Sequence, residues 1–135
     1  MNTAIAAIAA FSAGLAAAPI ELPPAGEEVD VTAGAVTALS CAQVARDKGD
    51  LLALTGCSYA EATKEIVVYD VAEKQIYRLT GKRVSRWQLE GAFGGGSIDF
   101  TGKVKQVIKK SGVAVVEVDE LSVTPKPKAG GFKGC

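Results

Sequence analysis

The clearest pattern in the chain is an alternation of apolar and polar positions from Ser97 to Lys105. One face would carry Ile98, Phe100, Gly102 and Val104. The other face would carry the polar residues Asp99, Thr101, Lys103 and Lys105. A period of two residues is typical of a strand that buries one face. We therefore expect a strand here, with Phe100 in the core and Thr101 on the opposite face.

Four other segments carry strand signals. The run Asp50–Cys57 is apolar and bounded by Gly49 and polar residues, which predicts a buried strand. Glu65–Val71 and Gln75–Thr80 are rich in β-branched and aromatic residues, and a connection of hairpin length joins them. In Val113–Val123 the apolar alternation slips by one residue near Asp119-Glu120, which predicts a strand with a β-bulge.

Two segments are expected to be helical. Thr37–Lys48 places apolar side chains at helical spacing and is followed by Gly49. Val84–Phe93 reads as a short helical segment between the third and fourth strands, and three glycines follow it. This order predicts a mainly β protein with a five-stranded, OB-fold-like barrel, closed or partly open, and a short helix between strands three and four. Closure suits so small a domain because it leaves few free strand edges.

The first residues resemble a targeting segment. Met1–Ala18 carries no charge and is half alanine, as in the apolar region of a secretory signal peptide. We expect a leader helix that is cleaved near Ala17 or Ala18, and an exported protein, periplasmic or secreted. Because no Lys or Arg precedes the apolar run, a retained membrane anchor and a helix packed on the domain remain alternatives. Membrane contact is expected only through an uncleaved leader.

The rest of the chain divides by composition. Residues 19–36 are acidic and rich in Pro and Gly, which predicts an extended or disordered arm. Residues 37–124 hold the expected strands and helices of the OB-fold-like domain. Residues 125–135 are rich in Lys, Gly and Pro, and we interpret them as a flexible tail.

Net charge and the absence of histidine make several classes of function less favourable for this chain. The 15 basic and 15 acidic residues leave no net charge, so there is no strong nucleic-acid signal. The chain has no histidine, which is the commonest general base and a common transition-metal ligand. We therefore expect no catalytic residue, no metal site and no cofactor, and a binding protein rather than an enzyme.

Three cysteines allow one disulfide and one free thiol in an oxidising compartment. A Cys41–Cys57 bond would close a short loop, whereas a Cys57–Cys135 bond would attach the tail to the barrel. The other interpretation is that Cys57 is a free thiol buried in the core. The sequence leaves these alternatives open.

Aromatic and basic residues form the candidate ligand site. Tyr69 and Tyr77 belong to the second and third strands, and this face commonly binds oligonucleotides and oligosaccharides in OB-folds. Further candidates lie on or just after the third strand, namely Arg78, Lys82, Arg83, Arg86 and Trp87. A stacking ring beside guanidinium groups can hold a base, a sugar or an anionic polymer. The competing interpretation, which we favour, is that the tyrosines fill the core and Trp87 closes the open end of the barrel.

Three short motifs carry a family resemblance. They are Leu54-Thr55-Gly56-Cys57, Tyr77-Arg78-Leu79-Thr80-Gly81 and Phe100-Thr101-Gly102-Lys103-Val104. With the leader, they resemble small exported bacterial OB-fold proteins of the periplasmic stress-tolerance (BOF) type and their uncharacterised relatives. The resemblance covers about residues 42–124 and implies an exported, non-enzymatic domain that binds a small or extended ligand. It carries over no catalytic residue, and the acidic arm and the Gly-Gly-Phe-Lys-Gly-Cys tail depart from it.

Together these patterns predict an exported binding domain. Its expected ligand is small or extended, anionic or a saccharide, and lies on the face of strands two and three. The alternative is a structural or assembly module whose partner is a protein of the cell envelope.

Overall fold

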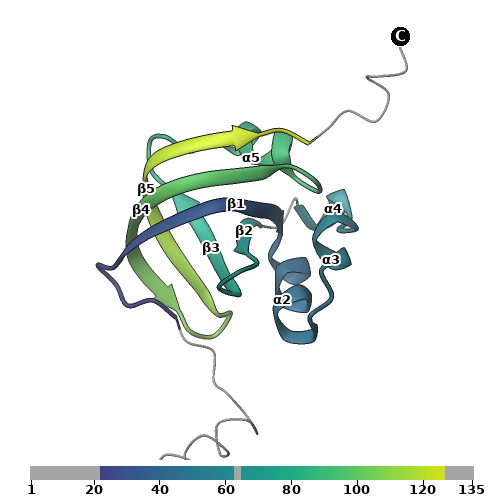
Figure 1. Cartoon of the computed structure of the whole chain (residues 1–135), viewed down its shortest axis with the longest axis horizontal. Coiled ribbons are helices and arrows are strands. Elements are labelled where there is room, and N and C mark those ends of the chain that lie inside the picture. The colour runs from purple at the N-terminus through teal and green to yellow at the C-terminus, as the bar shows by residue number, and fades with distance from the viewer. Residues whose placement is uncertain (1–21, 63–64, 127–135) are drawn as a thin grey trace, which may run out of the picture.

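Five strands close into a barrel in the computed structural model, which describes residues 22–62 and 65–126. The strands are β1 (Glu28–Ala38), β2 (Ile66–Asp70), β3 (Gln75–Thr80), β4 (Ser97–Ile108) and β5 (Val113–Thr124). Around the barrel their order is β1-β2-β3-β5-β4, and Figure 1 shows the strands curving around one another. All neighbours are antiparallel except β3 and β5, which are parallel. The mainly β barrel is confirmed, while the leader, Cys135 and most of the tail lie outside the described residues.

Four short helices are attached to the barrel in the described part of the chain. Three of them, α2 (Leu39–Lys48), α3 (Leu52–Thr55) and α4 (Tyr59–Ala62), lie between β1 and β2. The fourth, α5 (Arg86–Ala92), lies between β3 and β4, where the sequence predicts a short helix. In Figure 1 the first three helices form a group on one side of the barrel.

The predicted arm is wrong from Glu28 onward, because Glu28–Ala38 forms β1 and pairs with both β2 and β4. The barrel thus begins well before residue 37. A bulge hides the strand pattern: Val31 pairs with Phe100 and Gly34 with Ile98, which leaves an extra residue in β1. Within the bulge Ala33 has a φ of 57°, and its N–H donates to the Asp99 carboxylate at 2.6 Å. The extra residue and several small side chains break the alternation that would have revealed a strand.

The predicted strand Asp50–Cys57 is also wrong, because these residues form a turn and the four-residue helix α3. The Asp50 carboxylate accepts a hydrogen bond from the Leu52 N–H at 3.2 Å, which favours a turn. Leu54 packs inward, whereas the Leu52 side chain is 79% exposed. A short apolar run does not distinguish a strand from a helix without a clear period.

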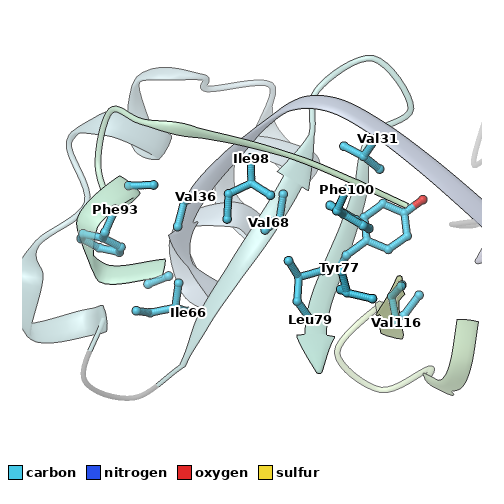
Figure 2. Close-up of a cluster of buried hydrophobic side chains, with 14 of the residues drawn as sticks. Val31, Val36, Ile66, Val68, Tyr77, Leu79, Phe93, Ile98, Phe100 and Val116 are labelled. Atoms are coloured by element: carbon cyan, nitrogen blue, oxygen red, sulfur yellow. The ribbon is translucent and has the colours of Figure 1, made fainter. Parts of the chain in front are cut away.

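Two apolar layers hold the structure together. Figure 2 shows the first layer inside the barrel, where Phe100 and Tyr77 meet edge to face with ring centroids 5.6 Å apart. The second layer lies between the helices and the outside of the sheet. It contains Ala42, Ala45, Leu54, Val67, Tyr69, Ile76 and Val113.

The register of β4 follows the alternation of its sequence. Phe100 is 2% exposed and points into the barrel, whereas Thr101 is only half-buried, which confirms the predicted faces. The predicted bulge in β5 is confirmed as well, because Thr101 pairs with Glu120 and Gly102 with Val118, leaving Asp119 unpaired. A Cβ at Gly102 would collide with the Glu117 carbonyl, so the close approach of β5 requires glycine here.

Candidate functional site

The predicted ligand face of β2 and β3 is largely covered. Tyr69 points to the outside of the sheet but lies beneath α2 and α3, and it is 1% exposed. Tyr77 points into the barrel and is 5% exposed. The interpretation that both tyrosines fill the core is confirmed, and their assignment as ligand-binding residues is wrong. Stacking on these rings is impossible because apolar side chains occupy the space.

The uncovered part of this face is a groove between the end of β3 and α5, which we call the β3–α5 groove. It has a volume of about 350 Å³. Its polar walls come from Glu65, Arg78, Thr80 and Arg86, and its apolar floor from Ile66, Leu79, Val84 and Leu89. The fold therefore brings two of the predicted arginines, Arg78 and Arg86, to one open groove.

Both arginines are paired with carboxylates. The Arg78 Nε donates to a Glu65 carboxylate oxygen. The Arg86 Nε donates to the Glu90 Oε2 at 2.9 Å across one turn of α5. These pairs hold the guanidinium groups in place and cancel much of their charge. The β3–α5 groove is therefore mixed in charge rather than a basic patch.

The other basic residues of the predicted cluster lie in a different groove. Lys82 and Arg83 line a hollow of about 640 Å³ at the β5 bulge, where they face Glu117, Asp119 and Glu120. The structure thus separates Arg83 from Arg78 and Arg86, although these residues are close in sequence. Both grooves contain acidic side chains, so neither has the single-signed charge that attracts a polyanion over a distance.

Trp87 is exposed at the start of α5. The helix begins with a reciprocal capping box between Ser85 and Gln88, which fixes its first turn. Leu89 and Ala92 then pack toward the barrel, which leaves the Trp87 side chain 75% exposed beside Arg86. The interpretation that Trp87 closes the end of the barrel is wrong, because a closing ring would be buried.

Sequence reasoning missed the acidic partners of the site. Glu90 follows Arg86 by four residues, a helical spacing that could have indicated the pair. Glu65 immediately precedes β2, and its contact with Arg78 depends on how β2 and β3 pair. No local pattern marks that second contact.

Cys41 and Cys57 form a disulfide with a Cα–Cα distance of 5.9 Å. This confirms the first predicted pairing, so the Cys57–Cys135 bond and the free buried Cys57 thiol are both wrong. The bond links α2 to the segment between α3 and α4. It thereby holds together the helical layer that covers Tyr69.

The described residues show no further chemical centre. Across residues 22–62 and 65–126, no three His, Cys, Asp or Glu side chains are grouped as a metal site would require. Within the same ranges, no helix is both long and apolar enough to cross a membrane. In comparisons with known proteins, no family model, no curated protein and no solved structure matches the chain.

The buried Tyr77 phenol predicts a loss of stability in alkaline solution. Burial, with a smaller contribution from nearby carboxylates such as Asp70, raises the pKa of Tyr77 from 10.0 to about 12. An unfolded chain loses this proton near pH 10, whereas the folded chain keeps it until about pH 12. The free energy of unfolding should therefore fall by about 2–3 kcal/mol as the pH rises through this window.

Urea denaturation at several pH values measures this effect. Tyr77→Phe is the matched control because it keeps the ring and removes the ionisable proton. Its stability should fall less steeply above about pH 10 than that of the wild type. Equal slopes for the two proteins would contradict the assignment of the effect to Tyr77.

Proposed function

We propose that this chain is an exported, OB-fold-like binding domain that takes a short saccharide in the β3–α5 groove. The strand order with its parallel β3–β5 pair, and the placement of α5 between β3 and β4, support an OB-fold. The uncharged, alanine-rich leader and the Cys41–Cys57 disulfide support an oxidising compartment outside the cytoplasm. A binding role is proposed rather than a catalytic one.

The observation that carries the proposal is the pairing of each groove arginine with a carboxylate. Sugar hydroxyls both donate and accept hydrogen bonds. A hydroxyl can therefore donate to Glu65 and accept from Arg78 in the same groove. Because Glu65 and Glu90 neutralise the two arginines, the groove has no excess positive charge to hold an anionic polymer, and a neutral saccharide suits it better.

Trp87 follows the groove residue Arg86 in the chain and offers an exposed stacking surface. Its ring is exposed and follows Arg86 directly in the first turn of α5. The apolar face of a sugar ring packs well on an indole, because both surfaces are flat and poorly hydrated. A saccharide longer than the groove can extend past Arg86 onto this ring.

The single tryptophan makes the test direct, because its emission reports only on Trp87. We expect neutral oligosaccharides such as cellohexaose, maltohexaose or chitohexaose to shift that emission in a saturable titration. Arg78→Ala should weaken binding by about tenfold, the effect of losing one hydrogen bond to a charged group. Arg83→Ala is the matched control and should leave the affinity unchanged, because Arg83 lines the other groove.

Two results would contradict this assignment. One is the absence of a saturable emission change with all three neutral sugars. The other is binding of a heparin oligosaccharide that Arg83→Ala weakens as much as Arg78→Ala does, since such binding would reflect diffuse charge.

A second candidate function is assembly with another protein. The helical layer exposes the large apolar side chains of Leu51, Leu52 and Tyr59, in addition to Trp87 on α5. Exposed apolar side chains of this size can mark interaction surfaces. Size-exclusion chromatography with light scattering separates the two functions, because a saccharide binder is expected to run as a monomer and an assembly module as a larger species.

A further inference from the structure

A third hollow, of about 590 Å³, lies at the hairpin that follows β4, apart from the sugar site proposed above. It is bounded by the segment Leu22–Ala25, by Val107 and by the β4–β5 hairpin at Lys109–Gly112. Figure 1 shows this hairpin beside the point where the described chain begins. Hydrogen bonds join Gly26 and Glu27 to Val104, so the segment is attached to the edge of β4. The volume lies in the range of small-molecule sites.

The inner wall of this hollow is built by α2. The Arg46 side chain is only 9% exposed, and its Nη1 donates to the Gly112 carbonyl at 3.2 Å. Gln43 Nε2 donates to the Ser111 carbonyl at 3.1 Å. A Cβ at position 112 would collide with the Arg46 guanidinium, so the hairpin passes directly over that group. These contacts hold the hairpin and α2 in a fixed relation before any ligand arrives.

The charge of this hollow differs from that of the other two grooves. Its lining contains Arg46, Lys109 and Lys110 and no acidic side chain. Arg46 is paired with Asp47 beside it, at 2.8 Å. Lys109 and Lys110 are exposed, and in the described ranges neither has a carboxylate within salt-bridge distance. Within the described part of the chain, the hollow is therefore lined by two ammonium groups that no carboxylate neutralises.

Apart from Ser111 and Gly112 of the hairpin, the remainder of the lining is apolar. The apolar lining consists of Leu22, Pro23, Pro24 and Ala25 together with Val107. Prolines have no backbone N–H, so this wall offers few donors to a polar ligand. An apolar wall beside a cationic rim matches a molecule with an apolar body and one anionic head.

We infer that this hollow is a second ligand site, which binds a single-chain carboxylate amphiphile with its head at Lys109 and Lys110. The apolar chain would lie against Leu22–Ala25 and Val107. This site shares no lining residue with the β3–α5 groove, so the two proposals can be tested independently of each other.

The test is a titration of the isotope-labelled full chain with octanoate below its micelle concentration, followed by amide NMR shifts. We expect saturable shifts at Lys109–Gly112 and at Ala25–Gly26. The double variant Lys109→Ala and Lys110→Ala should weaken binding by about tenfold. Lys103→Ala with Lys105→Ala is the matched control, because these lysines are exposed on β4, just before the hairpin, but do not line the hollow. The control pair should change the affinity by less than about twofold.

Two further ligands separate head from body. Acetate provides the head alone and 1-octanol the body alone, and each should bind at least about tenfold more weakly than octanoate. Equal binding of 1-octanol, equal weakening by the control pair, or shifts centred on Leu51 and Leu52 instead would each overturn the proposal. Failure of octanoate to bind would overturn it as well and would leave the saccharide titration unaffected.

Discussion

Phe100→Ala should lower the free energy of unfolding by about 3–5 kcal/mol. The side chain is 2% exposed, and its ring packs edge to face against the ring of Tyr77 inside the closed barrel. The surrounding strands are joined to one another all the way round, so they cannot collapse easily into the space left by the ring. Chemical denaturation followed by circular dichroism measures the loss.

Thr101→Ala is the matched control for this experiment. Thr101 is the next residue of β4 and lies on the opposite face, half-buried. Its replacement should change the free energy of unfolding by no more than about 0.5 kcal/mol. Similar losses for the two variants would mean that β4 does not have the register described here.

Removing the disulfide should produce the second large effect. The double variant Cys41→Ala and Cys57→Ala should lose about 3 kcal/mol of stability, because the bond closes a loop with a sequence separation of 16 residues. The loss should be accompanied by faster proteolysis of the segment around α3 and α4. These helices have four residues each and cannot be stable without the contacts that hold them.

Two comparisons check the origin of this effect. Treating the wild type with dithiothreitol should reproduce the loss seen in the double variant. Cys135→Ala should leave the stability unchanged, because Cys41 and Cys57 pair with each other. A destabilised Cys135→Ala protein would show that the tail cysteine exchanges into the bond.

Local patterns are enough to predict four of the five strands, by alternation for β4 and β5 and by β-branched and aromatic composition for β2 and β3. In β4 and β5 the side chains alternate between the barrel interior and its surface, and apolar and polar residues alternate in the sequence in the same way. The bulge at Asp119 was also predictable, because an extra residue shifts the phase of the alternation. β1 was missed because its own bulge, at Ala33, interrupts a strand of mostly small residues.

The candidate site was predictable only in part. The clustering of Arg78, Arg83 and Arg86 in sequence indicated a basic surface, yet the fold assigns them to two grooves with acidic walls. Whether a residue on a predicted sheet face meets solvent depends on what packs over it. Tyr69 of β2 is covered by α2 and α3, which precede β2 in the chain and were not expected to pack over it.

The sequence by itself determined the mainly β character, the positions of β2 to β5 and the inward direction of Phe100, because each depends on the composition or spacing of residues that are close together in the chain. Only the tertiary structure decided the closure through β1, the choice of Cys41 as the partner of Cys57, and the cover over Tyr69. The physical reason is that these features depend on contacts between segments distant in the chain. Such contacts are selected by the burial and pairing of the whole domain, and no local period records them.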